Sequence, residues 1–368
     1  MRCFPERPGP EPTRKDEAMS AKDADYEAFS AIQKIKQEQG ASLVILAHHY
    51  QRMEIVGLGD FAGDSFELSR RAAARRDARF IVFCGVHFMA ESAAILAGEN
   101  QTVQIPDINA GCPMADMADV VSVSRAWDEL GGVMDTRRLV PLVYVNSDAM
   151  LKAFTGRNGG SACTSANAEK AIAWAFEKGE KVLFFPDQHL GRNSGNALGL
   201  ASQDMVLWKS NEPLGGNTKK ALERARLILW DGHCHVHTDF TPGHISQARK
   251  KFPDAKIIVH PECPEEVVKL ADASGSTSRI IRFVEDAPQG STIIVGTEFN
   301  LVQRLNIQTP DKMVIPLARS ACPNMAKITL GKLLHTLQNL GTFNVVRIDP
   351  ATKKDAALAL DRMLALAG

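Results

Sequence analysis

The sequence predicts an α/β protein built on parallel sheets, and three observations lead to that class. Short apolar runs of strand length alternate with helical segments along most of the chain. Several of these runs are apolar without interruption, which is typical of strands covered by helices on both faces. The same order of strand, loop and helix then recurs at intervals of about a hundred residues. We therefore expect three similar three-layer α/β/α domains.

Six expected strands run directly into loops, and they pair in sequence order. In parallel α/β sheets the chemistry collects at the carboxyl ends of the strands. Three units packed about a pseudo-threefold axis would bring these ends together, so we expect an active site at the domain junction. The strands with their loops cover 42–51, 79–88, 139–148, 181–190, 256–265 and 291–300.

The repeat has polar side chains at the end of each first strand and a small-residue segment about twenty positions later. These segments lie at 61–69, 159–171 and 273–283, and each opens a helix. A Ser or Thr at such a helix start can cap the helix and bind an anion. The polar side chains are His48 and Tyr50, Tyr144 and Asn146, and His260 and Glu262.

A lone cysteine follows the second strand of each unit, at Cys112, Cys234 and Cys322. The seven cysteines of the chain are far apart, without a C-x-x-C pair, so a disulfide framework is not expected. Two interpretations stay open from the residues alone. All seven are small buried side chains, or some of them converge on a metal or cluster. In the second case, three thiolates would lie beside a site for a small polyanion.

The stretch L-W-D-G-H-C-H-V-H-T-D-F at 229–240 suggests a different metal site. On a strand, alternation places His233, His235 and His237 on one face and Cys234 on the other. An H-x-H pair of this kind begins the metal site of many zinc hydrolases. In those enzymes the pair lies on the first strand of an eightfold barrel, whereas here it comes late in the chain and the repeat is threefold.

Composition argues against several classes of protein. The 368 residues include 43 basic and 43 acidic side chains without a basic run, so we expect no nucleic-acid partner. The longest apolar stretches have strand length, so no membrane span is expected. The N-terminus is polar and Pro-rich and lacks the apolar core of a signal peptide. We expect a disordered leader over 1–22 and a cytoplasmic location.

An ordered set of short motifs resembles the quinolinate synthase family, the iron–sulfur enzymes of de novo NAD biosynthesis. The motifs cover about residues 28–335, and it is their order that makes the resemblance specific. They are AHHYQ, GDSFELS, FCGVHFMAE, YVNSDA, CTSANA, FFPDQHLG, VHPEC, GSTS and ACPNM.

The resemblance implies three α/β domains around a pseudo-threefold axis, each giving one cysteine to a [4Fe–4S] cluster. The implied ligands are Cys112, Cys234 and Cys322, which leave one iron open as a Lewis acid. The other cysteines would then be packing residues or lie in the leader, and Cys263 is the one close enough to line the cavity.

The resemblance also implies which residues surround the substrates. The catalytic candidates are Tyr50, His235, His260 and Glu262, without assignment to individual proton transfers. His233 and His237 are expected to be structural. The implied substrate-binding positions are His48, Ser65, Tyr144, Val145, Asn146, Ser165, His260, Pro261, Glu262 and Thr277.

The implied reaction condenses iminoaspartate with dihydroxyacetone phosphate to give quinolinate, phosphate and two waters, without a redox change. Both substrates are anions, which suits helix starts that donate hydrogen bonds. Because the imine is unstable in water, an aspartate-oxidising partner enzyme is expected. Two alternatives stay open: a zinc-dependent amidohydrolase that uses His233 and His235, and a metabolite sensor with a structural cluster.

The repeat also gives approximate domain boundaries. We expect the domains at 23–118, 119–232 and 233–319. The remaining segment, 320–368, is expected to return and pack on the first domain.

Overall fold

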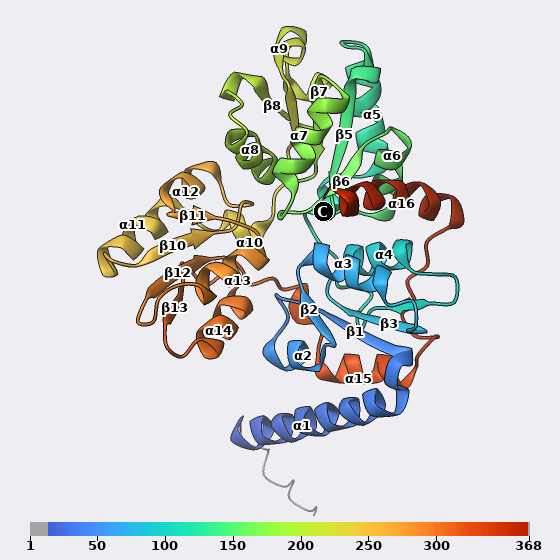
Figure 1. Cartoon of the computed structure of the whole chain (residues 1–368), viewed down its shortest axis with the longest axis vertical. Helices are drawn as coiled ribbons and strands as arrows, with labels where there is room; N and C mark the ends of the chain where they lie inside the picture. Colours follow the sequence, from blue (N-terminus) through green and yellow to red (C-terminus); the bar gives the residue numbers. More distant parts are fainter. Residues whose placement is uncertain (1–13, 367–368) are drawn as a thin grey trace, which may run out of the picture.

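The computed structural model describes residues 14–366, and their strands form three sheets that are parallel throughout (Figure 1). The first sheet has the order β2-β1-β3-β4. Every residue of its central strand β1 is buried, as expected for an uninterrupted apolar run covered on both faces. Its strands are β1 (Leu43–His48), β2 (Phe61–Gly63), β3 (Phe80–Cys84) and β4 (Thr102–Gln104).

The other two sheets repeat this order of strands. The second sheet is β6-β5-β7-β9-β8, with β8 as an additional edge strand, and the third is β11-β10-β12-β13. The second contains β5 (Leu139–Tyr144), β6 (Ser161–Cys163), β7 (Lys181–Phe185), β8 (Met205–Trp208) and β9 (Leu227–Trp230). The third contains β10 (Lys256–Val259), β11 (Ala273–Ser274), β12 (Thr292–Gly296) and β13 (Met313–Pro316).

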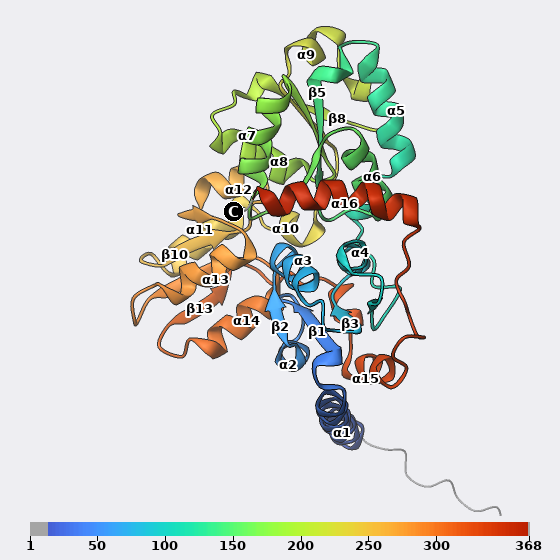
Figure 2. The ribbon, with the colours of Figure 1, turned by 45° about the vertical axis from the view of Figure 1, so that its right-hand side comes forward.

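Helices cover both faces of each sheet, which confirms the predicted α/β class (Figures 1 and 2). On the first sheet, α3 and α4 lie on one side and α2 and α15 on the other. The second sheet lies between α5 with α6 and α7 with α8, and the third between α11 with α12 and α13 with α14.

The helices alternate with the strands along the chain, and each sheet has its own set. Those around the first sheet are α2 (Met53–Leu58), α3 (Ser65–Ala74), α4 (His87–Leu96) and α15 (Leu330–Gln338). Those around the second are α5 (Val120–Gly131), α6 (Ala149–Arg157), α7 (Ala168–Lys178), α8 (Gln188–Ala197) and α9 (Lys219–Arg224). Those around the third are α10 (His235–Thr238), α11 (Pro242–Lys251), α12 (Glu265–Leu270), α13 (Thr277–Glu285) and α14 (Phe299–Gln308). Within residues 14–366, none of the helices has the length and apolar character that crossing a bilayer requires.

The parallel register places each repeated motif at the same edge of its sheet. His48 at the end of β1 stands opposite Gly63, and Tyr144 at the end of β5 stands opposite Cys163. The polar end of each first strand therefore lies beside the segment that opens the next helix. This is the edge at which parallel α/β proteins bind their ligands.

The N-terminal helix begins earlier than expected. Helix α1 (Arg14–Gln39) includes residues 14–22, which we had placed in a disordered leader. The stretch RKDEAMSAKDAD lacks Gly and Pro and is rich in good helix formers, so it continues the helix of the residues that follow. Residues 1–13 of the expected leader lie outside the described part of the chain.

The C-terminal segment divides between two domains. Helix α15 contacts α1 and β3, but α16 (Pro350–Ala365) lies mainly on α6 and β6 of the second domain (Figure 2). The expectation that 320–368 packs on the first domain is therefore wrong for α16. The close approach depends on Gly156 in α6, because any Cβ there would collide with the carbonyl oxygen of Asp355. The buried face of α16 consists of Ala356, Ala359, Leu360 and Met363.

Candidate active site

One cavity lies where the carboxyl ends of the three sheets meet, and side chains from all three domains line it. It brings together most of the residues that the sequence singled out. Additional lining residues include His237, Thr164, Asp64 and Met325. The sequence-predicted residues in its wall are His48, Tyr50, Ser65, Cys112, Tyr144, Asn146, Ser165, Cys234, His235, His260, Glu262, Thr277 and Cys322.

Two of the expected substrate-binding residues do not line this cavity. Val145 is buried, and its backbone N–H donates to the carbonyl oxygen of Cys163, so it is part of the sheet edge. Pro261 lines a neighbouring hollow instead. Its carbonyl oxygen accepts a hydrogen bond from Asn193 at 2.8 Å. Each of the two residues is next in the sequence to a residue that lines the cavity, and its own side chain points away from the cavity.

The three repeated cysteines, Cys112, Cys234 and Cys322, converge on the cavity, each after the last strand of a different sheet. Burial, and to a lesser degree the charge of Cys322, raises the pKa of the Cys112 thiol to about 12. Backbone N–H groups of the turn after each cysteine oppose that rise, from Ala115 beside Cys112 and from Met325 beside Cys322. Three cysteines that line one cavity and have backbone N–H groups directed at them fit a group that binds them all as thiolates, such as an iron–sulfur cluster.

The remaining described cysteines do not reach the cavity. Cys84 and Cys163 are fully buried in the cores of the first and second domains. Cys263 is also fully buried, among apolar residues of the third domain, so its expected place near the cavity wall is not found. Cys3 lies outside the described residues.

The histidine-rich stretch is not a strand beyond Trp230. Strand β9 ends there, and Cys234 is the residue before helix α10, so the histidines do not alternate across a sheet. Gly232 makes the turn possible, because a Cβ at this position would collide with the carbonyl oxygen of Pro186. His235 lines the cavity as expected. His237, which we had treated as structural, also lines it and is buried.

His237 is the centre of a hydrogen-bonded network around Glu262. Its Nδ1 lies 3.0 Å from Oε2 of Glu262, and its Nε2 lies 3.4 Å from the hydroxyl of Tyr50. Tyr144 donates to Oε1 of Glu262 at 2.5 Å. Thr297 lies 3.0 Å from the Tyr50 hydroxyl and 3.3 Å from His237 Nε2. The network therefore connects two phenols, an imidazole and a carboxylate from all three domains.

The environment sets the charge of each member of this network. Burial acts to raise the pKa of Glu262, but His237 and His260 outweigh it, and the pKa falls to about 2. Burial lowers the pKa of His260 to about 3, so this imidazole is neutral near neutral pH. Burial, followed by the charge of Glu262, raises the pKa of Tyr50 and of Tyr144. One carboxylate thus lies beside neutral phenols that can act as proton donors.

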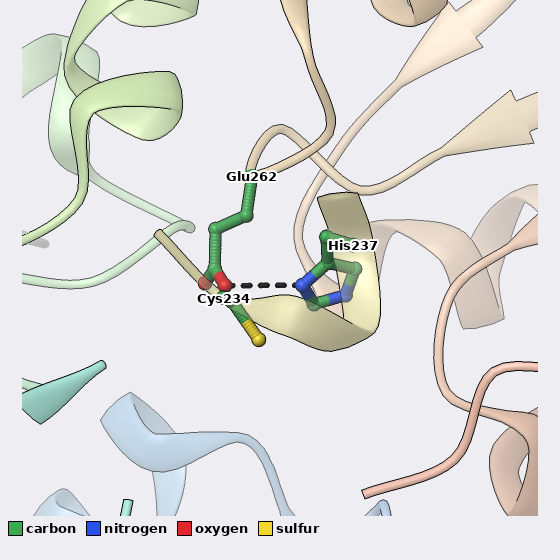
Figure 3. A group of neighbouring side chains, drawn as sticks. All are labelled: Cys234, His237 and Glu262. Carbon is green, nitrogen blue, oxygen red and sulfur yellow. Dashed lines mark hydrogen bonds and ion pairs between the residues drawn. The ribbon is translucent and has the colours of Figure 1, made fainter. Parts of the chain in front are cut away.

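Figure 3 shows Cys234, His237 and Glu262, whose potential ligand atoms all lie within 4.8 Å of one another. This group is the one set of metal-ligand type found among the described residues. Both carboxylate oxygens of Glu262 are already hydrogen-bonded, to Tyr144 and to His237. The carboxylate of Glu262 and Nδ1 of His237 are therefore already engaged with each other, and the Cys234 sulfur is the ligand atom of the three outside this pair.

The helix starts present their hydroxyls differently from the expected capping. Asp64 caps α3 by accepting from the N–H of Glu67, and Ser276 caps α13 by accepting from the N–H of Arg279. Ser65 and Thr277 are the first helical residues and line the cavity, so the caps do not occupy their hydroxyls. Helix α7 begins at Ala168, three residues after Ser165, so Ser165 lines the cavity from the loop before the helix.

Two buried polar atoms in the cavity have no hydrogen-bond partner in the described chain. They are Oδ1 of Asn146 and Nε2 of His235. A buried polar atom without a partner costs about 1 to 3 kcal/mol, so such atoms are expected to be paired with a ligand or water. Their position indicates a polar occupant between the second domain and the converging cysteines.

Lys152, fully buried in α6, supports the loop that carries Asn146 by donating to the carbonyl oxygen of Ser147. Burial lowers its pKa to about 8, although Glu91 and Asp148 act in the opposite direction. The unfolded chain therefore binds more protons than the folded chain at pH values between about 8 and the ordinary lysine value.

Folding stability should thus increase with pH over this interval because of Lys152. Relative to Lys152→Met, the free energy of unfolding of the unmodified chain should rise by about 2 kcal/mol from about pH 8 to about pH 10. Urea unfolding at both pH values measures the difference. Lys34→Met is the control, because that side chain is 78% exposed. An equal pH response of the Lys152→Met variant and the unmodified chain would show that folding does not lower the pKa of this lysine.

Buried bases and phenols close to converging thiols indicate a metal-dependent enzyme that acts on small polar molecules. Comparison with known proteins identifies the family within this class. The family model described as "Quinolinate synthetase A protein" matches residues 30–365. The chain belongs to the quinolinate synthase family.

Individual relatives agree with the family model over nearly the whole length. The chain is 47% identical to a quinolinate synthase of Corynebacterium glutamicum over 348 residues, which cover 93% of this chain and 88% of the relative. It is 50% identical to a quinolinate synthase of a Nocardioides species over 341 residues, covering 89% and 86% of the two chains. The motifs that suggested the family therefore belong to an extended similarity.

Proposed function

We propose that this chain condenses iminoaspartate with dihydroxyacetone phosphate to form quinolinate, phosphate and two waters. The observation that carries the proposal is the shared cavity. Cys112, Cys234 and Cys322, each following the last strand of a different sheet, converge beside the network of Tyr50, His237 and Glu262. A structural cluster in a sensor would not need this network.

The substrates would be held by neutral donors rather than by buried cations. The hydroxyls of Ser65, Ser165 and Thr277 line the cavity from three domains and suit phosphate and carboxylate oxygens. The unpartnered Asn146 side chain and His235 Nε2 are further sites for polar substrate atoms. Val145 and Pro261 would contribute only through the backbone or indirectly.

The network supplies the proton transfers. With Glu262 ionised, Nδ1 of His237 donates to it, and Nε2 of His237 faces the hydroxyl of Tyr50. Tyr50 can then give a proton to a departing substrate hydroxyl and regain one through His237. Tyr144, hydrogen-bonded to the same carboxylate, and His260, stacked on His237 at 4.2 Å between ring centroids, complete the set.

We propose Cys112, Cys234 and Cys322 as the ligands of a [4Fe–4S] cluster. The fit rests on the three convergent sulfurs and on the backbone N–H groups directed at them. When bound, such a cluster supplies an iron without a protein ligand, which acts as a Lewis acid on substrate oxygen. Removal of water from the substrate would require the Lewis-acidic iron and the proton donors to face the same side of the cavity.

This reaction also bears on the source of the imine and on the location of the protein. An aspartate-oxidising enzyme would have to supply the unstable imine, and we propose a cytoplasmic location for both. Domain boundaries near 118 and 232 fall between successive sheets, the boundary near 319 follows the third sheet, and all three remain part of the proposal.

The test is formation of quinolinate by the full chain after anaerobic reconstitution with iron and sulfide. Oxaloacetate with ammonia provides the imine, dihydroxyacetone phosphate is the second substrate, and mass spectrometry detects the product. We expect quinolinate and phosphate in equal amounts. A chain that binds iron and sulfide without forming quinolinate would favour the sensor, and one that binds only zinc would favour the amidohydrolase.

A further inference from the structure

A second hollow, which we call the entrance basin, lies beside the catalytic cavity and shares Asp64 and Ser165 with it. The basin is lined by residues near the starts of α3, α7 and α13, so all three domains contribute to it. A small molecule moving between solvent and the cavity on this side would pass along its wall. Apart from Ser165, which also lines the cavity, the side chains of the basin have no role in the proposed reaction.

The basin carries cationic side chains that have no acidic partner. Arg279 and Arg282, both on α13, line it, and neither forms an ion pair with a carboxylate among the described side chains of residues 23–366. A guanidinium group presents several N–H donors in a planar arrangement that matches phosphate oxygens, so these two groups are available to an anion.

Arg279 is also held in place. A Cβ on Gly275 would collide with the Cδ, Cγ and Cβ of Arg279, so the stem of this side chain lies directly over the glycine backbone. The glycine comes between β11 and the cap Ser276. Arg279 is exposed, but the contact with Gly275 fixes the path of its stem across the start of α13.

A second observation in the same wall points to a ligand. The hydroxyl oxygen of Ser274, next to Gly275, is buried and has no hydrogen-bond partner among the described residues. The hydroxyl at the end of β11 and the guanidinium in the first turn of α13 line the same hollow, and both are groups that donate to the oxygens of a phosphate.

The acidic side chains of the basin do not cancel this preference. Glu67 is paired with Arg71 at 3.1 Å, and Asp64 accepts hydrogen bonds from the Glu67 N–H and the Ser278 hydroxyl. Glu169 is exposed and lies next to Lys170 in the sequence. The carboxylates are thus occupied or solvated.

We infer that Arg279, together with Ser274, binds a phosphate group in the entrance basin, outside the catalytic cavity. The inference rests on the proposed function, in which one substrate is a phosphate monoester and one product is inorganic phosphate. The basin would hold either species as it enters or leaves. Arg279 is then a specificity residue for the phosphate-bearing molecule, not a catalytic residue.

Isothermal titration of the reconstituted full chain tests this inference without turnover. The probes are glycerol 3-phosphate, an unreactive monoester, and inorganic phosphate. Arg279→Gln should weaken binding of at least one probe by about tenfold, as expected for loss of one charge-assisted hydrogen-bonded pair. Gly275→Ala, which displaces the Arg279 stem, should weaken the same probe. Arg137→Gln is the matched control, because that arginine precedes β5 at the opposite edge of its sheet.

The pattern of losses distinguishes the sources of phosphate. A loss confined to glycerol 3-phosphate assigns the basin to the incoming substrate, and a loss confined to inorganic phosphate assigns it to the product. In turnover, Arg279→Gln should raise the KM for dihydroxyacetone phosphate and leave kcat unchanged. Equal affinities of Arg279→Gln and the unmodified chain for both probes would overturn the inference while leaving quinolinate formation intact. Absence of quinolinate from the unmodified chain would overturn the proposed function, and the binding result could still be evaluated.

Discussion

Replacing Cys112 by serine is expected to abolish both cluster binding and quinolinate formation. The sulfur of Cys112 lies in the cavity close to Cys322 and receives backbone N–H groups suited to a thiolate. A serine hydroxyl stays protonated and does not replace a thiolate toward iron. After anaerobic reconstitution, the broad visible absorption of the iron–sulfur chromophore should be missing and product should fall below detection.

The matched control for this loss is Cys84→Ala. Cys84 belongs to the same domain but is fully buried in its core, where burial raises the pKa of the thiol to about 12. This variant should retain iron, sulfide and activity if it folds, which circular dichroism checks for both variants. Cys322→Ser should repeat the loss from a second domain. Full iron and sulfide in Cys112→Ser would refute the convergence of the three cysteines on one cluster.

Glu262→Gln should lower kcat by about a hundredfold to ten-thousandfold while the cluster remains bound. The amide has nearly the same shape but cannot carry the charge that orients Nδ1 of His237 and accepts from Tyr144. His237 would then lose the partner that lets Nε2 exchange protons with Tyr50. Rapid-quench single turnovers, with iron determined on the same samples, separate the chemical defect from loss of the cluster.

Tyr50→Phe is the companion variant, because it removes the other end of the same network. If the two residues serve different proton transfers, the variants should accumulate different intermediates in a single turnover. Identical residual rates with identical intermediates would contradict a division of labour between Tyr50 and Glu262. Unchanged kcat in Glu262→Gln would show that the carboxylate has no part in the reaction.

The features that repeat in the sequence were the ones that could be predicted. Uninterrupted apolar runs such as the one in β1 gave the parallel sheets, since burial on both faces leaves that pattern. The order of strand, small-residue segment and cysteine recurs three times, and a parallel fold places all such segments at one edge. The resemblance to a family then specified side chains such as Tyr144 that no local pattern indicates.

His237 was missed because period-two alternation was applied beyond the end of a strand. Asp231 and Gly232 end β9, and the chain turns into α10. With helical spacing, Cys234 and His237 are three residues apart and fall on the same side of the turn. The D-G dipeptide is a turn signal, so it predicts that the strand ends there and that Cys234 and His237 follow helical spacing.

Other differences depend on tertiary contacts that the local sequence does not encode. The apolar face of α16 does not specify by itself which domain covers it, and Gly156 in α6 allows the close approach that the structure shows. The cap of α3 was predictable in principle, since Asp64 and Glu67 have the spacing of a capping box. Assigning the cap to Ser65 overlooked this pair, although the prediction that Ser65 belongs to the site does not depend on it.

The central claim is that three cysteines from three domains hold one four-iron cluster in the cavity that forms quinolinate. Its most direct test is the determination of iron and acid-labile sulfide per chain in anaerobically reconstituted protein that is forming quinolinate. We predict about four of each per active chain, with both values lost together in Cys112→Ser, Cys234→Ser and Cys322→Ser. Quinolinate formation by protein containing zinc alone, or about two irons per chain, would contradict the account.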